Sequence, residues 1–213
     1  WMRNGSGNHA PTPGSDHAEA PQGRYRRRMI SHDPGEVLRP LRRVRQVRQF
    51  TDQPIDPAAL DAIVDVGRWS GSSRNSQPWR FIVLRDVELI RRVAAMDMPH
   101  SRALVTAMAA VVVVVPSTGS AVSYAYDEGR TSERMLIAAQ SLGLGAGLLW
   151  VSPDARPRVA EALGIPQGWM ARSVLAVGHP TTEALAPKHP PGQARLPRSR
   201  MVSQDRWTDE LSG

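Results

Sequence analysis

Apolar residues recur along much of the chain at helical spacing, and elsewhere they gather into short continuous runs. Between residues 36 and 47 an apolar stripe alternates with arginines, which predicts an amphipathic helix. Asp56 and Pro57 suit the start of a second helix, which we expect to end near Trp69. Further helices are predicted over residues 87–96, 124–142 and 153–163.

The continuous apolar runs predict the strands. Residues 109–115 are alanine and valine throughout, and a strand that is apolar on both faces belongs in the middle of a sheet covered by helices on both sides. Other strands are expected over 79–84, 148–151 and 173–178, whereas the glycines of 143–147 indicate a flexible turn. Helices and strands alternate without repeats, so the sequence predicts an α+β or α/β sandwich.

The two ends of the chain differ in composition from its middle. Residues 1–33 consist largely of Gly, Pro, Ser, His and Arg without periodicity, which predicts a disordered basic tail. Residues 34–180 carry the periodic pattern of a folded domain, and residues 181–213 form a proline-rich, extended arm. The histidines of the tail are not at metal-ligand spacing, so no metal site is predicted.

The net charge of +7 comes almost entirely from arginine, since Lys188 is the single lysine. Many of the arginines lie between residues 24 and 48, where a solvated basic segment is one interpretation and an anion site is another, because guanidinium groups match phosphate oxygens. The basic stretch has no interleaved aromatic residue beyond Tyr25 and no nucleic-acid motif, so we do not expect nucleic-acid binding.

Two further classes of protein are disfavoured. The chain has no cysteine, which excludes disulfides and thiolate nucleophiles. No run approaches the ~18–20 apolar residues that a membrane span needs. We therefore expect a cytoplasmic protein without a membrane partner.

Residues 68–81 are the stretch richest in candidate chemistry. Small polar residues surround Asn75 and Gln77, and two aromatic residues, Trp79 and Phe81, follow them. Such a loop offers amides and hydroxyls beside aromatic walls, which suits a flat heterocyclic ligand with hydrogen-bonding edges. Taken alone, Asn75 is typical of a turn and Trp79 of a core residue.

Residues 72–79, SSRNSQPW, closely resemble the loop SSxNxQPW of the FMN-dependent nitroreductase family. Residues 45–51, RQVRQFT, resemble the opening R-S-x-R-x-F of that family, and residues 139–145, AQSLGLG, provide a third resemblance. The three stand in the family's order and span about residues 38–207. The resemblance implies a three-layer α/β/α sandwich with a mixed, mainly antiparallel sheet. It also implies an intertwined homodimer, with FMN at the interface and the arm 181–213 wrapping the partner subunit.

The resemblance also implies which residues hold the cofactor. These are Arg45, Gln46, Arg48, Ser73, Asn75, Gln77, Leu149, Trp150, Val151 and Arg195. Arginines suit the phosphate, side-chain amides suit the edge of the ring, and backbone amides of 149–151 would face flavin N5. For Arg45 and Arg48, solvated helix charges are the alternative. Tyr124, Tyr126 and Arg130 are predicted to contact the substrate, with packing as the alternative role.

The predicted activity is that of an FMN-dependent oxidoreductase, which passes a hydride from NAD(P)H through flavin N5 to a nitroaromatic, quinone or similar small acceptor. No catalytic side chain is assigned, because the redox chemistry belongs to the flavin. One alternative is a flavin-fragmenting or dehalogenating relative, and another is a non-catalytic flavin-binding or basic interaction protein. Val44, Gln46 and Trp150 depart from residues common in the family, which affects the phosphate grip and the pocket shape.

Overall fold

The computed structural model describes residues 33–96, 98–190 and 192–207, so the predicted tail lies outside the described residues except for Asp33. The chain divides into two units, Trp1–Arg39 and Pro40–Gly213, and the sheet belongs to the second. Helix α2, Pro34–Arg43, contains the division and carries Pro40 within it. The prediction of a helix as far as residue 47 is wrong at its end, because residues 44–49 are not helical.

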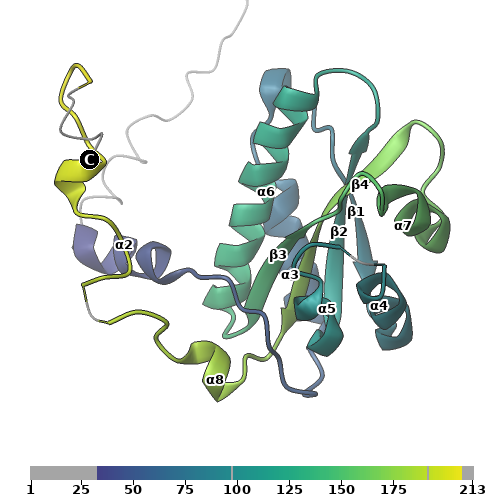
Figure 1. The fold of residues 1–213 in the computed structure, drawn as a ribbon, viewed down its shortest axis with the longest axis horizontal. Helices are drawn as coiled ribbons and strands as arrows, with labels where there is room; N and C mark the ends of the chain where they lie inside the picture. The colour runs from purple at the N-terminus through teal and green to yellow at the C-terminus, as the bar shows by residue number, and fades with distance from the viewer. Residues whose placement is uncertain (1–32, 97, 191, 208–213) are drawn as a thin grey trace, which may run out of the picture. The chain divides into compact units, whose positions relative to one another are not determined.

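Four strands form one sheet in the order β1-β2-β4-β3 (Figure 1). They are β1, Arg80–Leu84; β2, Ala109–Pro116; β3, Gly145–Trp150; and β4, Trp169–Gly178. All three pairings are antiparallel. The valine-rich strand β2 lies between β1 and β4 and is buried over 109–115, which confirms its predicted place inside the sheet.

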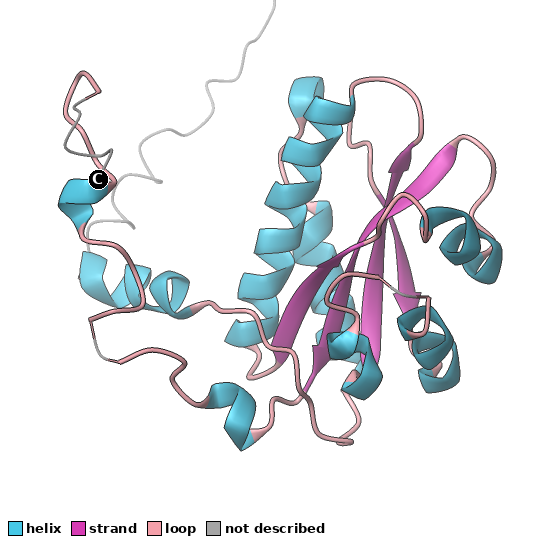
Figure 2. Ribbon diagram, in the orientation of Figure 1, coloured by secondary structure: helices cyan, strands magenta, loops and turns pink. Residues whose placement is uncertain are grey.

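Helices cover both faces of this sheet (Figure 2). One face carries α3, Pro57–Arg68, and α6, Ala121–Ser141. The other carries α4, Val87–Ala94; α5, Arg102–Thr106; and α7, Arg156–Leu163. Successive residues of β2 therefore enter different cores: Val111 and Val113 pack with α3 and α6, whereas Val112 packs with the opposite helices. The predicted three-layer sandwich is confirmed.

Local sequence explains where the helices begin. Asp56 accepts a hydrogen bond from the Ala58 N–H at 2.9 Å, with Pro57 as the first helical residue. Asp86 accepts from the Glu88 N–H at 2.9 Å and so caps α4. After β4 come a short α-helix, α8, Thr182–Leu185, and a 3-10 helix, η2, Arg198–Arg200. No helix among the described residues is long and apolar enough to cross a membrane.

Two of the glycines predicted to form a turn lie inside β3 and allow another segment to pack closely against it. Gly145 and Gly147 lie within the strand, so the predicted turn over 143–147 is partly wrong. A Cβ atom on Gly147 would lie 2.2 Å from the backbone oxygen of Val47, and one on Gly145 would lie 2.8 Å from the Val47 side chain. Glycine is needed at these positions because the backbone of another stretch lies directly against Gly147 and its Val47 side chain against Gly145.

Candidate functional site

That other backbone is residues 44–50, here called the edge segment, which follows the outer edge of β3. The Val47 N–H donates to the Ala146 carbonyl at 2.8 Å. Two residues further along β3, the Leu148 N–H donates to the side-chain oxygen Oε1 of Gln46 at 2.6 Å. This bond fixes the orientation of the Gln46 amide, so its Nε2 group remains as a donor for another partner.

The hydrogen-bond pattern of β3 shows which backbone amides face this outer edge. The Val151 N–H donates to the Arg172 carbonyl of β4 at 2.8 Å. Bonding direction alternates along an antiparallel strand, so Leu149 also faces β4, whereas Trp150 faces outward with Leu148. Of the three predicted backbone contacts to a flavin, Trp150 is therefore the one whose N–H points to the edge segment's side.

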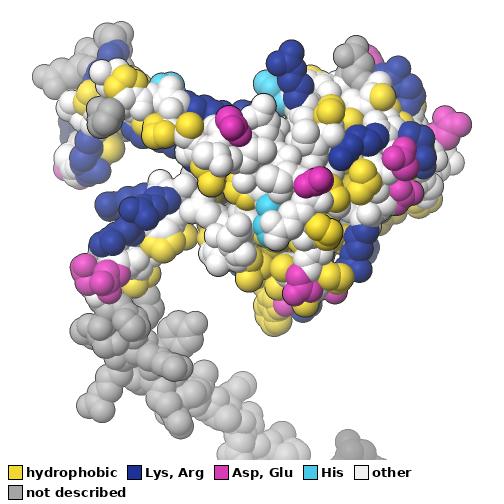
Figure 3. All heavy atoms as spheres, turned by 90° about the horizontal axis from the view of Figure 1, so that it is seen from below, with side chains coloured by type: hydrophobic (Ala, Val, Ile, Leu, Met, Phe, Trp, Pro, Cys, Tyr) yellow, Lys and Arg dark blue, Asp and Glu magenta, His cyan; other side chains and the backbone are white. Residues whose placement is uncertain are grey.

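A cavity of about 430 Å³ opens beside the edge segment. This volume is within the range of small-molecule sites. Its lining residues are Gln46, Arg48, Gln49, Arg102, Val105, Thr106, Glu183, Ala184 and Lys188. Three of them are basic and one is acidic. Seen from below in Figure 3, basic, acidic and apolar side chains are mixed on this side of the molecule, which differs from a continuous basic surface.

Arg102 and Lys188 were not predicted as site residues. Arg102 is the first residue of α5, and Lys188 lies in the proline-rich stretch after α8. Neither belongs to a sequence motif that would mark it. Folding brings both of them to the cavity that Arg48 also lines. In the sequence, Lys188 is distinguished only as the single lysine of the chain.

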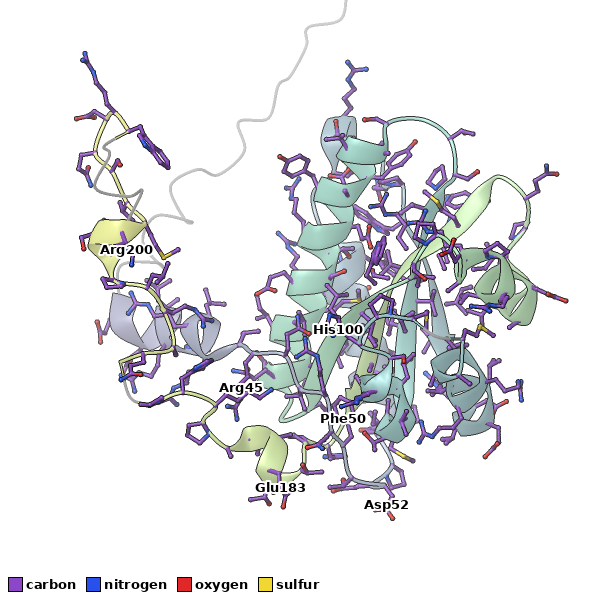
Figure 4. All side chains as sticks on the ribbon, viewed as in Figure 1. Arg45, Phe50, Asp52, His100, Glu183 and Arg200 are labelled. Atoms are coloured by element: carbon purple, nitrogen blue, oxygen red, sulfur yellow. The ribbon has the colours of Figure 1, made fainter. Side chains whose placement is uncertain are left out.

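The edge segment also pairs with the chain that leaves β4. Phe50 and Pro180 form an antiparallel bridge, and the Thr51 N–H donates to the His179 carbonyl at 2.8 Å. Arg45 donates to the carbonyl oxygens of Leu185 and Ala186 at the end of α8. Figure 4 shows Arg45, Phe50 and Glu183 on the segments that meet here. The Arg45 guanidinium is therefore engaged by the protein's own backbone.

Arg195, the other predicted phosphate ligand, is exposed and donates to the carbonyl of its neighbour Ala194 at 2.7 Å. It does not line the cavity with Arg48. The structure thus brings together Gln46, Arg48 and the outer edge of β3, and it leaves Arg195 apart from them.

The second predicted region is the amide loop, residues 72–77. Residues 73–77 are exposed. The Gln77 N–H donates to Ser72 Oγ at 2.9 Å, and Gln77 Nε2 lies 3.3 Å from Asn75 Oδ1, so the two predicted amide side chains lie together. Trp79 is 4% exposed and packs in the core, which confirms its interpretation as a core residue.

Within one chain the amide loop and the edge segment are far apart. The loop contacts α6 at Asp127, through the Ser73 N–H. The edge segment lies at the other end of that helix, where Arg45 and Val47 line a second hollow with Gln140. Asp127 and Gln140 are thirteen positions apart along α6, or ~20 Å at the helical rise per residue. One chain therefore does not enclose a ligand between its two predicted regions.

The three predicted substrate residues of α6 have different surroundings. Tyr124 is half-buried against the core of α3 and α6. Tyr126 is 74% exposed. The Arg130 guanidinium lies beside Gly71 and 3.7 Å from Asp127, so it packs on the start of the amide loop.

Comparisons with known proteins agree on one family. The model of the nitroreductase family matches residues 41–114. A protein of Archaeoglobus fulgidus, described as an NADH dehydrogenase/NAD(P)H nitroreductase, is 31% identical over 153 residues, which cover 70% of this chain and 87% of that protein. The FMN reductase [NAD(P)H] of Bacillus subtilis is 23% identical over 195 residues, covering 83% and 78%. A nitroreductase structure from Desulfovibrio desulfuricans in complex with FMN matches with a TM-score of 0.65 and 24% identity, covering 84% of this chain and all of that one.

Proposed function

Because the chain belongs to the nitroreductase family, we propose that it is an FMN-dependent oxidoreductase that uses NAD(P)H to reduce a nitroaromatic, a quinone or a similar small acceptor. The observation that carries the proposal is the cavity lined by Gln46 and Arg48, in which Gln46 is bonded through its Oε1 to the outward edge of β3. When bound, FMN supplies the redox chemistry, by accepting a hydride and passing electrons to the second substrate. The protein supplies binding, orientation and charge.

The residues around the cavity fit an anionic flavin. Arg48, Arg102 and Lys188 place three cations there, which suit a phosphate group and a ring that becomes anionic on reduction. Glu183 offsets part of that charge. Gln46 Nε2 and the Trp150 N–H are neutral donors on the same edge, and we propose that they bond to the polar atoms of the ring.

We further propose that the working unit is a homodimer in which each site takes Arg48 from one chain and the amide loop from the other. The separation of ~20 Å along α6 supports this, because neither region alone surrounds a ligand. Large apolar side chains that remain exposed support it as well, among them Trp69, Val122 and Trp150. In this proposal the arm 181–213, of which residues 191 and 208–213 are outside the described part, wraps the partner subunit.

In the same proposal Arg45 ties the arm to its own chain, and Arg195 completes the phosphate grip only in the assembled dimer. Tyr126 would then be available to a substrate, since it is exposed on α6. We also propose a cytoplasmic location. The chain has no cysteine, which is compatible with a reducing compartment.

The test is the visible spectrum of the purified protein after incubation with FMN and desalting. We expect a yellow protein with about one flavin per chain, which NADH or NADPH bleaches in a stopped-flow instrument. Addition of menadione or a nitroaromatic should restore the colour. A protein that takes up no FMN contradicts the proposal. A protein that binds FMN but is not reduced by millimolar nicotinamide contradicts the oxidoreductase assignment alone.

A further inference from the structure

Asp127 is a buried carboxylate that contacts the amide loop. It lies near the start of α6 and is 2% exposed. Both of its oxygens are 3.2 Å from the backbone nitrogen of Ser73, the residue at which the exposed part of the loop begins. Arg130, one turn further along the helix, lies 3.7 Å from the same carboxylate with its side chain 57% exposed. The Ser73 N–H is therefore held by a charged acceptor within the protein.

The amide loop needs such an anchor because its backbone is strained. Arg74, Asn75 and Gln77 have φ angles of 52°, 53° and 46°, in the left-handed region that residues other than glycine seldom adopt. Each such residue costs free energy and persists only when its surroundings hold it in place. Inside the loop, bonds from Gln77 to Ser72 and Asn75 do part of this, but they do not tie the loop to the fold.

The neighbouring acid, Glu128, shows what a purely structural carboxylate does in the same helix. It is 8% exposed, and its Oε2 lies 2.7 Å from Arg172 Nε of β4. Burial lowers the pKa of Arg156, the adjacent Arg172 lowers it further, and Glu128 raises it. Glu128 thus neutralises a partly buried cation between a helix and the sheet, whereas Asp127 bonds to a backbone amide of the loop.

We infer that Asp127 is a positioning residue, which holds Asn75 and Gln77 in the conformation that meets the flavin. The inference rests on the proposed function. A buried carboxylate is costly unless it is well bonded, and the partners of Asp127 among the described residues are the Ser73 N–H and Arg130. Its bond to Ser73 is charge-assisted, and a neutral side chain of the same shape would hold the loop less firmly.

The test compares Asp127→Asn with Glu128→Gln in the full-length protein. Asp127→Asn keeps the shape and removes the charge, and we expect FMN affinity to fall about tenfold, because a neutral bond replaces a charge-assisted one. The visible circular dichroism and the midpoint potential of the bound flavin should change as well. Glu128→Gln should lower the melting temperature at least as much, while leaving the FMN affinity, dichroism and potential as in the wild type.

A second variant approaches the same bond from the loop. Ser73→Pro removes the N–H, and Ser72 already has the extended backbone, φ −134° and ψ 163°, that a residue before proline prefers. Ser73→Pro should reproduce the Asp127→Asn spectrum. The double variant Asp127→Asn with Ser73→Pro should lose little more than either alone.

Two results would overturn the inference. One is wild-type FMN affinity, dichroism and potential in Asp127→Asn. The other is the same spectral change in Glu128→Gln, which would point to general loosening of α6. Failure of the proposed function looks different, because in that case the wild-type protein itself binds no FMN.

Discussion

The edge segment and the amide loop are both predicted to touch the cofactor, yet the fold holds them in opposite ways. The edge segment is fixed by backbone: Val47 pairs with β3, and Gly147 leaves the space that it occupies. The amide loop is exposed, and a side chain of α6, Asp127, accepts from its Ser73 N–H. Damage to the first region should therefore cost stability and binding together, whereas damage to the second should cost mainly binding.

The largest effect should come from Gly147→Ala. The new Cβ would meet the Val47 oxygen at 2.2 Å, so the edge segment must move. We expect the free energy of unfolding to fall by ~1–3 kcal/mol, as for overpacked cores, and FMN to be lost on desalting. Chemical denaturation and flavin titration measure the two effects.

The control for this change is Gly129→Ala. A Cβ on Gly129, in the middle of α6, would meet nothing within 4 Å. It should raise stability by ~0.5–1 kcal/mol and leave FMN binding intact. Normal FMN retention in Gly147→Ala would show that the edge segment does not position the cofactor.

The next effect tests whether the two regions serve one site from different chains. Arg48→Ala and Asn75→Ala should each weaken FMN binding, the former by ~1.5–3 kcal/mol because a charge-assisted bond is lost. Co-expressed with two different tags and purified as a mixed dimer, they should regain one wild-type site per dimer. Flavin titration of the mixed dimer gives the affinity and the stoichiometry.

That recovery follows because one of the two sites would then receive an intact Arg48 and an intact loop. If both regions instead served a site within their own chain, every site in the mixed dimer would carry one defect. No tight binding would then reappear, and the shared-site proposal would fail.

The smallest effect should come from the basic residues that line the cavity without belonging to a motif. Arg102→Ala and Lys188→Ala should each weaken FMN binding by ~0.5–1.5 kcal/mol at low salt, and by less as salt screens the phosphate. Arg92→Ala is the matched control, because Arg92 is an exposed arginine of α4 outside the cavity lining. An equal loss of FMN affinity in Arg92→Ala would show that the effect comes from the net charge of the protein and not from the residues of the cavity.

Sequence patterns predicted the layers of this fold well, because they depend on local signals. The valine run of β2, the cap at Asp56 and the stripe of α6 each carry their own information. The helix predicted through residue 47 failed because Val44 and Val47 fit a helical stripe but Val47 is buried, 5% exposed, against glycines about a hundred residues away. The turn predicted at Gly145 and Gly147 failed for the same reason, because their pairing with β4 depends on tertiary structure.

The candidate site was predictable to the extent that it lies in motifs. Gln46 and Arg48 lie at the cavity, and Asn75 lies beside Gln77. Arg102 carries no sequence signal and Lys188 is marked only as the single lysine, because the cavity is made by α5, α8 and the edge segment coming together. The bonds from Arg45 to the carbonyl oxygens of Leu185 and Ala186 could not be predicted either. Every residue has a carbonyl group, so the sequence does not show which one a side chain contacts.

The bridge between Phe50 and Pro180 bears on how the protein is made. Translation delivers residues 44–50 early, but their partners at 179–186 emerge from the ribosome only after the whole sheet has been synthesised. At ~5–20 residues per second, the interval is ~6–26 s. Because β4 joins β2 to β3, the sheet is completed only when that last strand has emerged, and the pocket beside α8 forms after it. In the proposed function, cofactor capture therefore belongs to the end of biogenesis.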